Sequence, residues 1–388
     1  MLRAKLYYSP TINYLKDNIM ENISPQEKCC RDISKGSAFP EKQNRNTKKY
    51  VLSGIFLLAL TAVTFYIIFK DNSIEEIFSL LKNVKIIFVI GGAMSMLCYI
   101  VVQGLIIGMA AKCIRAKLRL REMIQYSCIG FFYSGVTPSS TGGQPMQFYY
   151  MCRDRMSPSK VTLVMFITNI SYQIAVVLIG LSMFIFKLKY LVSVSGSIIV
   201  AFFIGISINL FILFILAGVL FSESLLKKML KGIVSFLNKI RIIKKPEKVL
   251  RGIDKYLDEF SNGVKLIKAN RKRFFMTLLA TVVQLLFYYI VPYFVYKAFG
   301  LSGYSFFDIV AINAILFVAV SMFPLPGSVG AAESGFLLLF GPIFSAAIMP
   351  SMLLSRFINF YTMMIISGIV SAYAHLRKPY CLPKNYKK

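Results

Sequence analysis

The stretch SMFPLPGSVGAAESGF, residues 321–336, decides how this chain can fold. It lies inside an apolar stretch, 308–345, that is long enough to enter a bilayer, but its Pro and Gly residues interrupt any helix there. A second apolar stretch, 123–152, is interrupted by GVTPSSTGGQP at 135–145. Membranes tolerate broken helices where the released backbone is buried in protein or lines a cavity. The sequence therefore predicts two re-entrant helix pairs; the alternative is that Gly and Pro only kink two ordinary spans.

Uninterrupted apolar runs surround these two stretches, and each approaches or exceeds the roughly 20 residues that a helix needs to cross the hydrocarbon core. They are residues 51–69, 86–111, 161–186, 191–221, 274–299 and 350–376. The chain is 56% hydrophobic, and its mean hydropathy of +0.64 is too high for a soluble domain. The predicted fold class is an all-α polytopic membrane protein with about six full transmembrane helices and two broken-helix pairs.

The order of these elements repeats along the chain. The half 51–186 runs span, span, broken pair, span, and the half 191–376 has the same order in the opposite orientation. Basic residues flank the first broken stretch, which predicts that it enters from the cytoplasm, whereas the second enters from the outer side. Paired Gly/Pro-interrupted segments in corresponding positions of an inverted repeat point to a binding site near the bilayer midplane.

Basic residues dominate the charge of the chain, with 45 Lys and Arg against 17 Asp and Glu and a formal net charge of +28. Such a charge can indicate nucleic-acid binding, but 38 of the 45 basic residues fall in five segments outside the apolar runs. These segments are the tail up to residue 49, 112–121, 153–160, 222–273 and the tail from residue 377. The positive-inside rule places them, with both termini, in the cytoplasm beside anionic lipids. No nucleic-acid partner is therefore expected.

Three parts make up the predicted organisation: a flexible basic cytosolic tail at 1–49, a transmembrane domain at 50–378 and a second cytosolic tail at 379–388. The first apolar run starts too late for a cleaved signal peptide. Within the transmembrane domain, the cytosolic insert 222–273 has apolar residues at three and four residue intervals, with lysines between them. This pattern predicts a basic amphipathic helix, which either lies on the anionic leaflet or packs as a helical hairpin on the bundle.

Metal and nucleotide sites are not predicted. The seven cysteines form no CxxC pair, and the chain has a single histidine, His375. Zinc sites need several Cys or His ligands at short spacings. The phosphate-binding motifs GxxxxGK[ST] and GxGxxG do not occur. We therefore expect no metal and no cofactor, and we interpret His375 as an interfacial residue at the cytosolic end of the last span.

Two acidic residues, Asp308 and Glu333, lie inside the predicted membrane body, both in the second broken stretch. Ionisable groups there are costly and are therefore functional candidates. Glu333 follows residues 324–332, where a new helix can begin, so one interpretation is a carboxylate that stabilises a helix N-terminus. The other is a partner for a cationic lipid head group or for Arg356, an arginine within a span. Asp308 is interpreted as an outer helix cap after Ser305.

The first broken stretch offers hydroxyl groups, glycines and a helix start. Pro145 is expected at the first position of the next helix, whose exposed amides would attract phosphate. Arginines farther along could pair with a lipid phosphate. The alternative is that these polar groups only satisfy irregular backbone. The predicted head-group residues are Ser140, Thr141, Gly142, Gly143, Gln144, Pro145, Arg153 and Arg155 in the first stretch and Pro326, Gly327, Gly330, Glu333 and Arg356 in or after the second.

Isolated amide side chains occur within otherwise apolar helices. Hydrogen bonding between helices is the default role of such residues in membranes. They are Asn169, Gln173, Asn209, Gln284, Asn313 and Asn359.

Two motifs, STGGQPMQFYYMCRD at 140–154 and FPLPGSVGAAESGF at 323–336, together resemble the transmembrane region of the lysylphosphatidylglycerol synthase and flippase family. The likeness covers about residues 48–378. It implies a protein of the bacterial inner membrane that moves aminoacylated phosphatidylglycerol between leaflets and protects against cationic antimicrobial peptides. The motif positions carried over are Ser140, Gly142, Gly143, Pro145, Pro326, Gly327, Gly330 and Glu333.

The chain departs from this family in one respect. Full-length members carry a cytosolic domain that transfers lysine from lysyl-tRNA to the lipid, whereas no soluble stretch here exceeds about fifty residues, which is short for a catalytic domain. We therefore expect translocation of (aminoacyl-)phosphatidylglycerol or a related anionic lipid. Two alternatives stay open: phosphatidylglycerol lysyltransferase activity, with lysyl-tRNA as a partner, and a non-catalytic role beside a separately encoded synthase.

Overall fold

The computed structural model describes residues 79–137, 140–154, 156–194, 196–222, 227, 232, 246–321, 328 and 330–377. The elements in these ranges are helices. The expected span 51–69, both tails, most of the segment 223–245, and the site residues Arg155, Pro326 and Gly327 lie outside the described residues.

Long apolar helices account for the five expected spans that fall within the described residues. The segments long and apolar enough to cross a membrane are α5 (Ile86–Cys113), α8 (Pro158–Val194), α9 (Gly196–Phe221), α12 (Arg271–Tyr289) with α13 (Val291–Ala298), and the helices from Ala331 to Leu376. A helix satisfies its backbone hydrogen bonds internally, which a lipid environment requires. The fold is therefore that of an all-α multi-pass membrane protein, as the sequence predicts.

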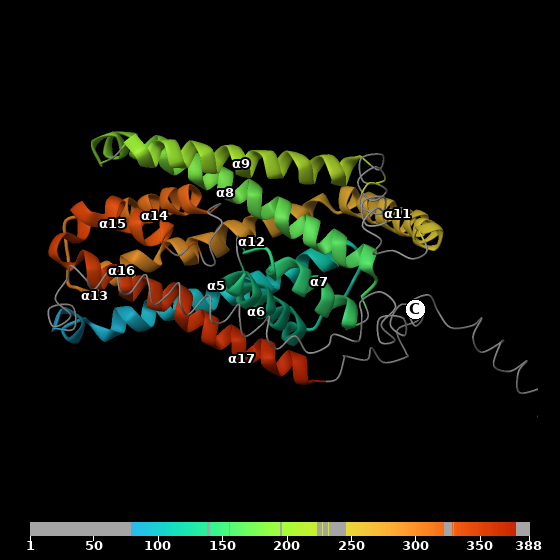
Figure 1. The fold of residues 1–388 in the computed structure, drawn as a ribbon, viewed down its shortest axis with the longest axis horizontal. Coiled ribbons are helices and arrows are strands. Elements are labelled where there is room, and N and C mark those ends of the chain that lie inside the picture. The colour runs from blue at the N-terminus through green and yellow to red at the C-terminus, as the bar shows by residue number, and fades with distance from the viewer. Residues whose placement is uncertain are drawn as a thin grey trace, which may run out of the picture.

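Both broken stretches are pairs of short helices. The first pair is α6 (Leu120–Val136) and α7 (Gly143–Arg153), and the second is α14 (Phe306–Val320) and α15 (Ala331–Phe344). With 11 to 17 residues, each helix is short for a full crossing. The partners of each pair contact each other, and the two pairs lie toward opposite ends of the long axis (Figure 1). This arrangement agrees with two re-entrant elements that enter from opposite sides.

The expected span 274–299 is two helices, because the chain breaks at Ile290 between α12 and α13. Pro292 lies in the first turn of α13, where a residue without an N–H group leaves no hydrogen bond unmade. The apolar pattern runs through this break, so hydropathy alone did not predict it.

The last expected span, 350–376, also contains a break. It consists of α16 (Ile348–Arg356), a π-helical turn η4 (Phe357–Thr362) and α17 (Met363–Leu376). A short 3₁₀ turn, η3 (Ser345–Ala347), connects α15 to α16, and its first residue, Ser345, has a φ of +46°. Helices α15 and α16 contact each other across this turn. π-helical turns are rare in proteins as a whole, and those that occur are frequently located at functional sites.

The insert 222–273 packs on the bundle where it is described. Helix α11 (Pro246–Ala269) contacts α8 and buries Leu257 and Phe260. The Tyr256 hydroxyl donates to the Thr162 hydroxyl oxygen at 2.9 Å. The apolar pattern at 225–237 that predicts the amphipathic helix lies outside the described residues, except for residues 227 and 232, so its two alternatives stay predictions.

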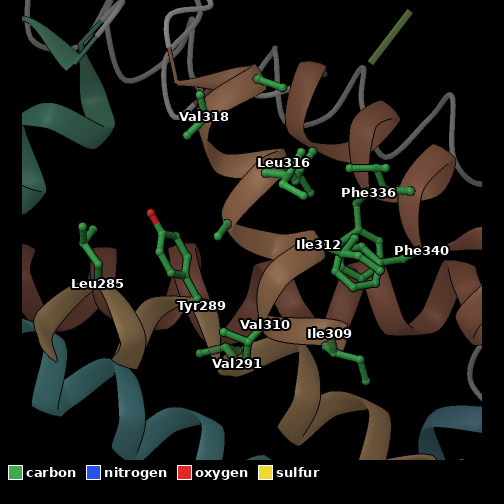
Figure 2. Packing of buried hydrophobic residues seen from close by; sticks show 14 of the residues in the cluster. Leu285, Tyr289, Val291, Ile309, Val310, Ile312, Leu316, Val318, Phe336 and Phe340 are labelled. Carbon is green, nitrogen blue, oxygen red and sulfur yellow. The ribbon is translucent and has the colours of Figure 1, made fainter. Parts of the chain in front are cut away.

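The core that positions the second broken pair surrounds α14. Figure 2 shows Leu316 of α14 on the side of Phe336 from α15, with Tyr289 from α12 on the other side. A Cβ placed on Gly205 of α9 would lie 2.2 Å from the carbonyl oxygen of Val318, so glycine allows α9 to approach the α14 backbone. Small residues at such contacts let membrane helices pack closely.

Candidate functional site

Glu333 is a helix-capping residue. Helix α15 begins after Gly330, whose φ of +88° favours glycine. The Gly330 backbone N–H donates to one carboxylate oxygen of Glu333, Oε2, at 2.6 Å. The carboxylate therefore stabilises the N-terminus of α15, as one interpretation of the sequence predicts.

The same carboxylate also pairs with Arg356. The guanidinium Nε lies 2.7 Å from the other oxygen, Glu333 Oε1, and both side chains are largely buried, at 8% exposed for Glu333 and 16% for Arg356. The Arg356 Nη2 lies 3.5 Å from the carbonyl oxygen of Ser328, in the break before α15. A buried charge without a partner is strongly unfavourable, so each residue makes the other tolerable. Both interpretations of Glu333 therefore hold at once.

Aromatic side chains border this ion pair. The Arg356 guanidinium lies 5.8 Å from the centre of the Phe360 ring, in η4. Tyr288 of α12 lies within electrostatic range of both Glu333 and Arg356. Tyr288 in turn belongs to a tyrosine cluster that also contains Tyr99 of α5, Tyr172 of α8 and Tyr289 of α12.

The tyrosine cluster contains residues of three long helices, α5, α8 and α12. The ring centres of Tyr99 and Tyr288 are 5.9 Å apart, and those of Tyr288 and Tyr289 are 6.0 Å apart. Tyr289 is buried, whereas the other three tyrosines are partly accessible. The Phe360 ring is therefore the aromatic contact of the ion pair, and the tyrosine cluster interacts with the pair through its electrostatic field.

Several buried oxygen atoms near this cluster have no hydrogen-bond partner among the described residues. They are the Tyr289 hydroxyl and the amide oxygens of Gln284 and Gln173. Gln284 lies one helical turn before Tyr288, and Gln173 directly follows Tyr172. Leaving a buried polar atom unpaired costs about 1–3 kcal/mol, so each of these oxygen atoms calls for a partner such as an ordered water molecule or a bound polar group.

The expected hydrogen bonds of the isolated amides are only partly made between helices. Asn313 of α14 donates to the carbonyl oxygen of Tyr289 at 3.2 Å, and Asn169 of α8 accepts from the Gln144 amide at 2.7 Å. Asn209 bonds within its own helix, to the carbonyl of Gly205. The amide oxygen of Asn359, in η4, is unpaired among the described residues.

A local hydrogen bond connects the two sides of the break in the first pair. The Gly142 N–H donates to the Thr137 hydroxyl oxygen at 2.8 Å, and Ser140 has a φ of +54°. Helix α7 begins at Gly143, so Pro145 occupies the third helical position and the prediction of the first position is wrong. The first turn tolerates this shift, because its N–H groups have no partner within the helix.

The remaining predicted residues of the first pair lie apart from the ion pair. Ser140, Thr141, Gln144 and Pro145 are exposed at the break. At the end of α7, Arg153 donates to the carbonyl oxygen of Ala374 at 2.9 Å. Figure 1 places the end of α17, which carries Ala374, at the opposite end of the bundle from α15.

Arg153 belongs to a cluster of polar residues around Asp154, the Asp154 cluster. Arg377 and the Tyr126 hydroxyl approach one Asp154 oxygen to 2.6 Å and 2.9 Å. Nearby, His375 contacts the Tyr150 hydroxyl at 3.3 Å. This cluster ties α7 to the end of α17, and the structure does not bring Arg153 together with Glu333.

The two breaks nevertheless meet through η4. Near the end of α6, a Cβ placed on Gly135 would lie 2.5 Å from Met364 Sδ and 3.4 Å from a ring carbon of Phe360. Phe360 is the ring that borders the Arg356 guanidinium. One side chain therefore separates the first broken pair from the ion pair of the second.

Asp308 has the expected capping role at the start of α14. It accepts from the backbone N–H and the hydroxyl of Ser305, at 2.9 Å and 2.8 Å. It also forms an ion pair with Lys187, at the far end of α8. The hydrogen bond from Lys187, followed by those from Ser305, lowers the pKa of the Asp308 carboxyl.

A family model described as "Lysylphosphatidylglycerol synthase TM region" matches residues 51–367. The match contains both broken pairs, the ion pair and the tyrosine cluster. No curated protein matches the chain. Sequence reasoning identified Glu333 and Arg356 but missed the tyrosine cluster, because its members are far apart in sequence and each reads alone as an ordinary aromatic residue of a span.

Proposed function

Because the chain belongs to the lysylphosphatidylglycerol synthase transmembrane-region family, we propose that it translocates a phospholipid between the leaflets of the membrane. The proposed cargo is (aminoacyl-)phosphatidylglycerol or a related lipid with an anionic phosphate. By altering the charge of the outer leaflet, this activity contributes to resistance against cationic antimicrobial peptides. The proposed location is the bacterial inner membrane, with both termini in the cytoplasm.

The buried Glu333–Arg356 pair is the observation that carries this proposal. A guanidinium binds phosphate and carboxylate with the same planar geometry, so a lipid phosphate can share or replace the carboxylate on Arg356. Ionisable residues at membrane depth mark substrate pathways more often than they serve packing. The position of the pair, at the break of a short-helix pair, matches the binding sites of transporters with inverted repeats.

Exchange between two partners also explains how a head group could be released. Phosphate on Arg356 frees Glu333, and the return of Glu333 restores the ion pair and expels the phosphate. The acyl chains stay in the bilayer while the head group passes through the bundle. Conduction of a polar group requires binding of this kind, strong enough for entry and weak enough for exit.

Reconstituted vesicles test translocation. The purified chain is placed in vesicles with acyl-labelled fluorescent phospholipids, and dithionite bleaches the label in the outer leaflet. We expect the protected fraction to fall below that of empty vesicles, and Arg356→Gln to slow this loss about tenfold or more, as the removal of a buried charged donor would. The exposed Arg121→Gln variant is the control. Movement equal to that of empty vesicles would refute the proposal.

Cells expressing the chain separate translocation from the two alternatives. Labelled lysine incorporated into lipid by the chain alone would support a transferase instead. Co-purification with a synthase, without movement of lipid in vesicles, would support a non-catalytic partner. Increased survival with a cationic peptide, abolished by Arg356→Gln at equal protein levels, is the result expected from the proposed function.

A further inference from the structure

The ion pair between Glu333 and Arg356 presents one acidic and one basic group that a ligand could bind. Among the described residues, Glu122, Asp154 and Glu333 are the buried acids. Glu122 accepts from the Arg119 backbone N–H at the start of α6, and Asp154 is held by Arg377 in the Asp154 cluster. Of these three, Glu333 is the carboxylate beside the tyrosine cluster, and it is matched by Arg356.

Counting charge restricts which head group can occupy this site. If a lipid phosphate takes Arg356, Glu333 remains as a buried carboxylate next to a second anion, which is strongly unfavourable. One ammonium group on the same head group would pair with Glu333 and restore neutrality. A head group without an amine leaves the carboxylate unmatched, and a head group with two amines leaves one ammonium unmatched.

The tyrosine cluster supplies what an ammonium group requires besides a carboxylate. Ammonium ions are attracted to the faces of aromatic rings within about 6 Å. The rings of Tyr99, Tyr288 and Tyr289 lie side by side, and Phe317 contacts Tyr288 and Tyr289 at 5.2 Å and 5.6 Å between ring centres. These rings come from α5, α12 and α14, so they surround the region from several helices.

The unpaired oxygen atoms distinguish a primary ammonium from other groups. The Gln284 amide oxygen can only accept a hydrogen bond, whereas the Tyr289 hydroxyl can accept or donate one, and both residues are at most 1% exposed. In Figure 2 the Tyr289 hydroxyl points away from Val291 and Val310, which pack beside its helix. A primary ammonium has three N–H donors for such acceptors. Phosphate oxygens and quaternary ammonium groups have no N–H donor to offer.

We propose that the site formed by Glu333, Arg356 and the tyrosine cluster, here called the central site, selects a phospholipid head group with one phosphate and one primary ammonium. Such a head group has no net charge. Arg356 binds the phosphate, and Glu333 binds the ammonium together with the tyrosine cluster and Gln284. This inference rests on the proposed function and narrows its cargo: phosphatidylethanolamine and alanyl-phosphatidylglycerol have this chemistry, whereas phosphatidylglycerol and lysyl-phosphatidylglycerol do not.

Binding to the purified full chain tests selectivity without requiring translocation. Native mass spectrometry with mixed lipids compares phosphatidylethanolamine and alanyl-phosphatidylglycerol with phosphatidylglycerol, lysyl-phosphatidylglycerol and phosphatidylcholine. We expect the zwitterionic primary amines to bind about tenfold more tightly than the other three, because an unmatched buried charge or unpaired acceptor is avoided. Tighter binding of phosphatidylglycerol or lysyl-phosphatidylglycerol would overturn the proposal, and equal binding of phosphatidylcholine would remove the role of the acceptor oxygens.

A charge substitution provides the sharpest test. Glu333→Gln keeps an oxygen that can cap α15 but removes the negative charge, so we expect the preference to shift by about tenfold from phosphatidylethanolamine toward phosphatidylglycerol. Tyr289→Phe keeps the ring and is expected to weaken phosphatidylethanolamine binding several-fold. Tyr296→Phe is the matched control, because the Tyr296 hydroxyl instead accepts from the Tyr304 N–H.

These experiments separate the inference from the function on which it rests. Selective binding without movement in vesicles would refute translocation and leave the site assignment intact. Movement of every phospholipid at one rate, with no binding preference, would support translocation and refute the selective site. If Glu333→Gln is not recovered as folded protein, the lipid series and Tyr289→Phe still decide the outcome.

Discussion

At the scale of single residues, Glu333 has two partners that act on different oxygen atoms. Oε2 accepts from the Gly330 N–H at the start of α15, and Oε1 pairs with Arg356. A structural role and a binding role are therefore not alternatives for this side chain. Replacements that separate the two roles are more informative than simple loss of the carboxylate.

Glu333→Ala should strongly destabilise the protein. The substitution removes the cap, worth about 0.5–2 kcal/mol, and leaves Arg356 buried without its carboxylate, which costs about 3–5 kcal/mol when a buried pair loses one partner. Thermal unfolding in detergent, followed by circular dichroism, measures the change. The double variant Glu333→Ala/Arg356→Leu should regain part of the loss, and a double variant less stable than Glu333→Ala would contradict the pairing.

Acid should weaken the end of the bundle where α14 begins, through Asp308. Because the pKa of this carboxyl is lowered in the folded protein, its contribution to stability is complete above the ordinary Asp value of about 3.9. That contribution is lost as the pH falls through the lower, folded-state value. Unfolding temperatures measured between neutral pH and this acidic range should fall for the wild type. Asp308→Asn should be less stable near neutrality and lack this component of the pH dependence; an unchanged slope would exclude Asp308 as its source.

At the scale of elements, glycines set how closely the short helices approach. A Cβ placed on Gly143 would lie 2.6 Å from the carbonyl oxygen of Gly130 and 2.0 Å from Ser134 Oγ, so α6 and α7 touch where α7 begins. Among the described residues, none has an atom within 4 Å of a Cβ placed on Gly196 at the start of α9. The two glycines therefore provide a matched pair for substitution.

Gly143→Ala should push α7 away from α6 and destabilise the protein by about 1–3 kcal/mol, as overpacking does. Gly196→Ala should change stability by less than about 1 kcal/mol, because alanine is the better helix former and meets no neighbour. Thermal unfolding of both variants in the same detergent makes the comparison. Equal effects at the two positions would mean that the close contact between α6 and α7 does not constrain the fold.

The sequence predicts the helices better than the breaks and turns within them. Apolar runs and Pro/Gly interruptions identify the long helices and both broken pairs, since lipid demands continuous hydrogen bonding. The break at Ile290 and the turn η4 leave the apolar pattern unchanged, so no periodicity reveals them. The pairing of Glu333 with Arg356 could be expected from their rarity in the membrane. The tyrosine cluster could not, because it arises from contacts between distant helices.

At the scale of the whole molecule, the two halves of the chain interlock. Helix α17 of the second half packs on α6 of the first, and α5 of the first half contacts α12 and α13 of the second. The Asp154 cluster adds a polar contact between the halves, in which Asp154 at the end of α7 pairs with Arg377 at the end of α17. Residues from both halves therefore surround the central site, and neither half encloses it alone.

Arg377→Ala should destabilise the protein, because it removes the ion pair between Arg377 and Asp154. Its side chain is 8% exposed and that of Asp154 is 2%, so we expect a loss of about 2–4 kcal/mol, moderated by the nearby Arg153. Unfolding in detergent measures the loss, with Arg271→Ala, at an exposed arginine in the first turn of α12, as the control. If both variants unfold alike, the buried ion pair does not hold the halves together.

The turn η4 has one more consequence, for how this protein tolerates insertions and deletions. A π-helical turn holds one residue more than an α-helical turn, and each residue of an α-helix rotates by about 100°. Deleting one residue between Phe357 and Thr362 would leave an ordinary α-helical turn with the same total rotation, so α17 would keep its orientation relative to α16. Deleting one residue within α17 would instead rotate the rest of that helix by about 100° and turn its face away from α6. A frame-preserving loss of a single codon is therefore expected to be less damaging in η4 than inside α17.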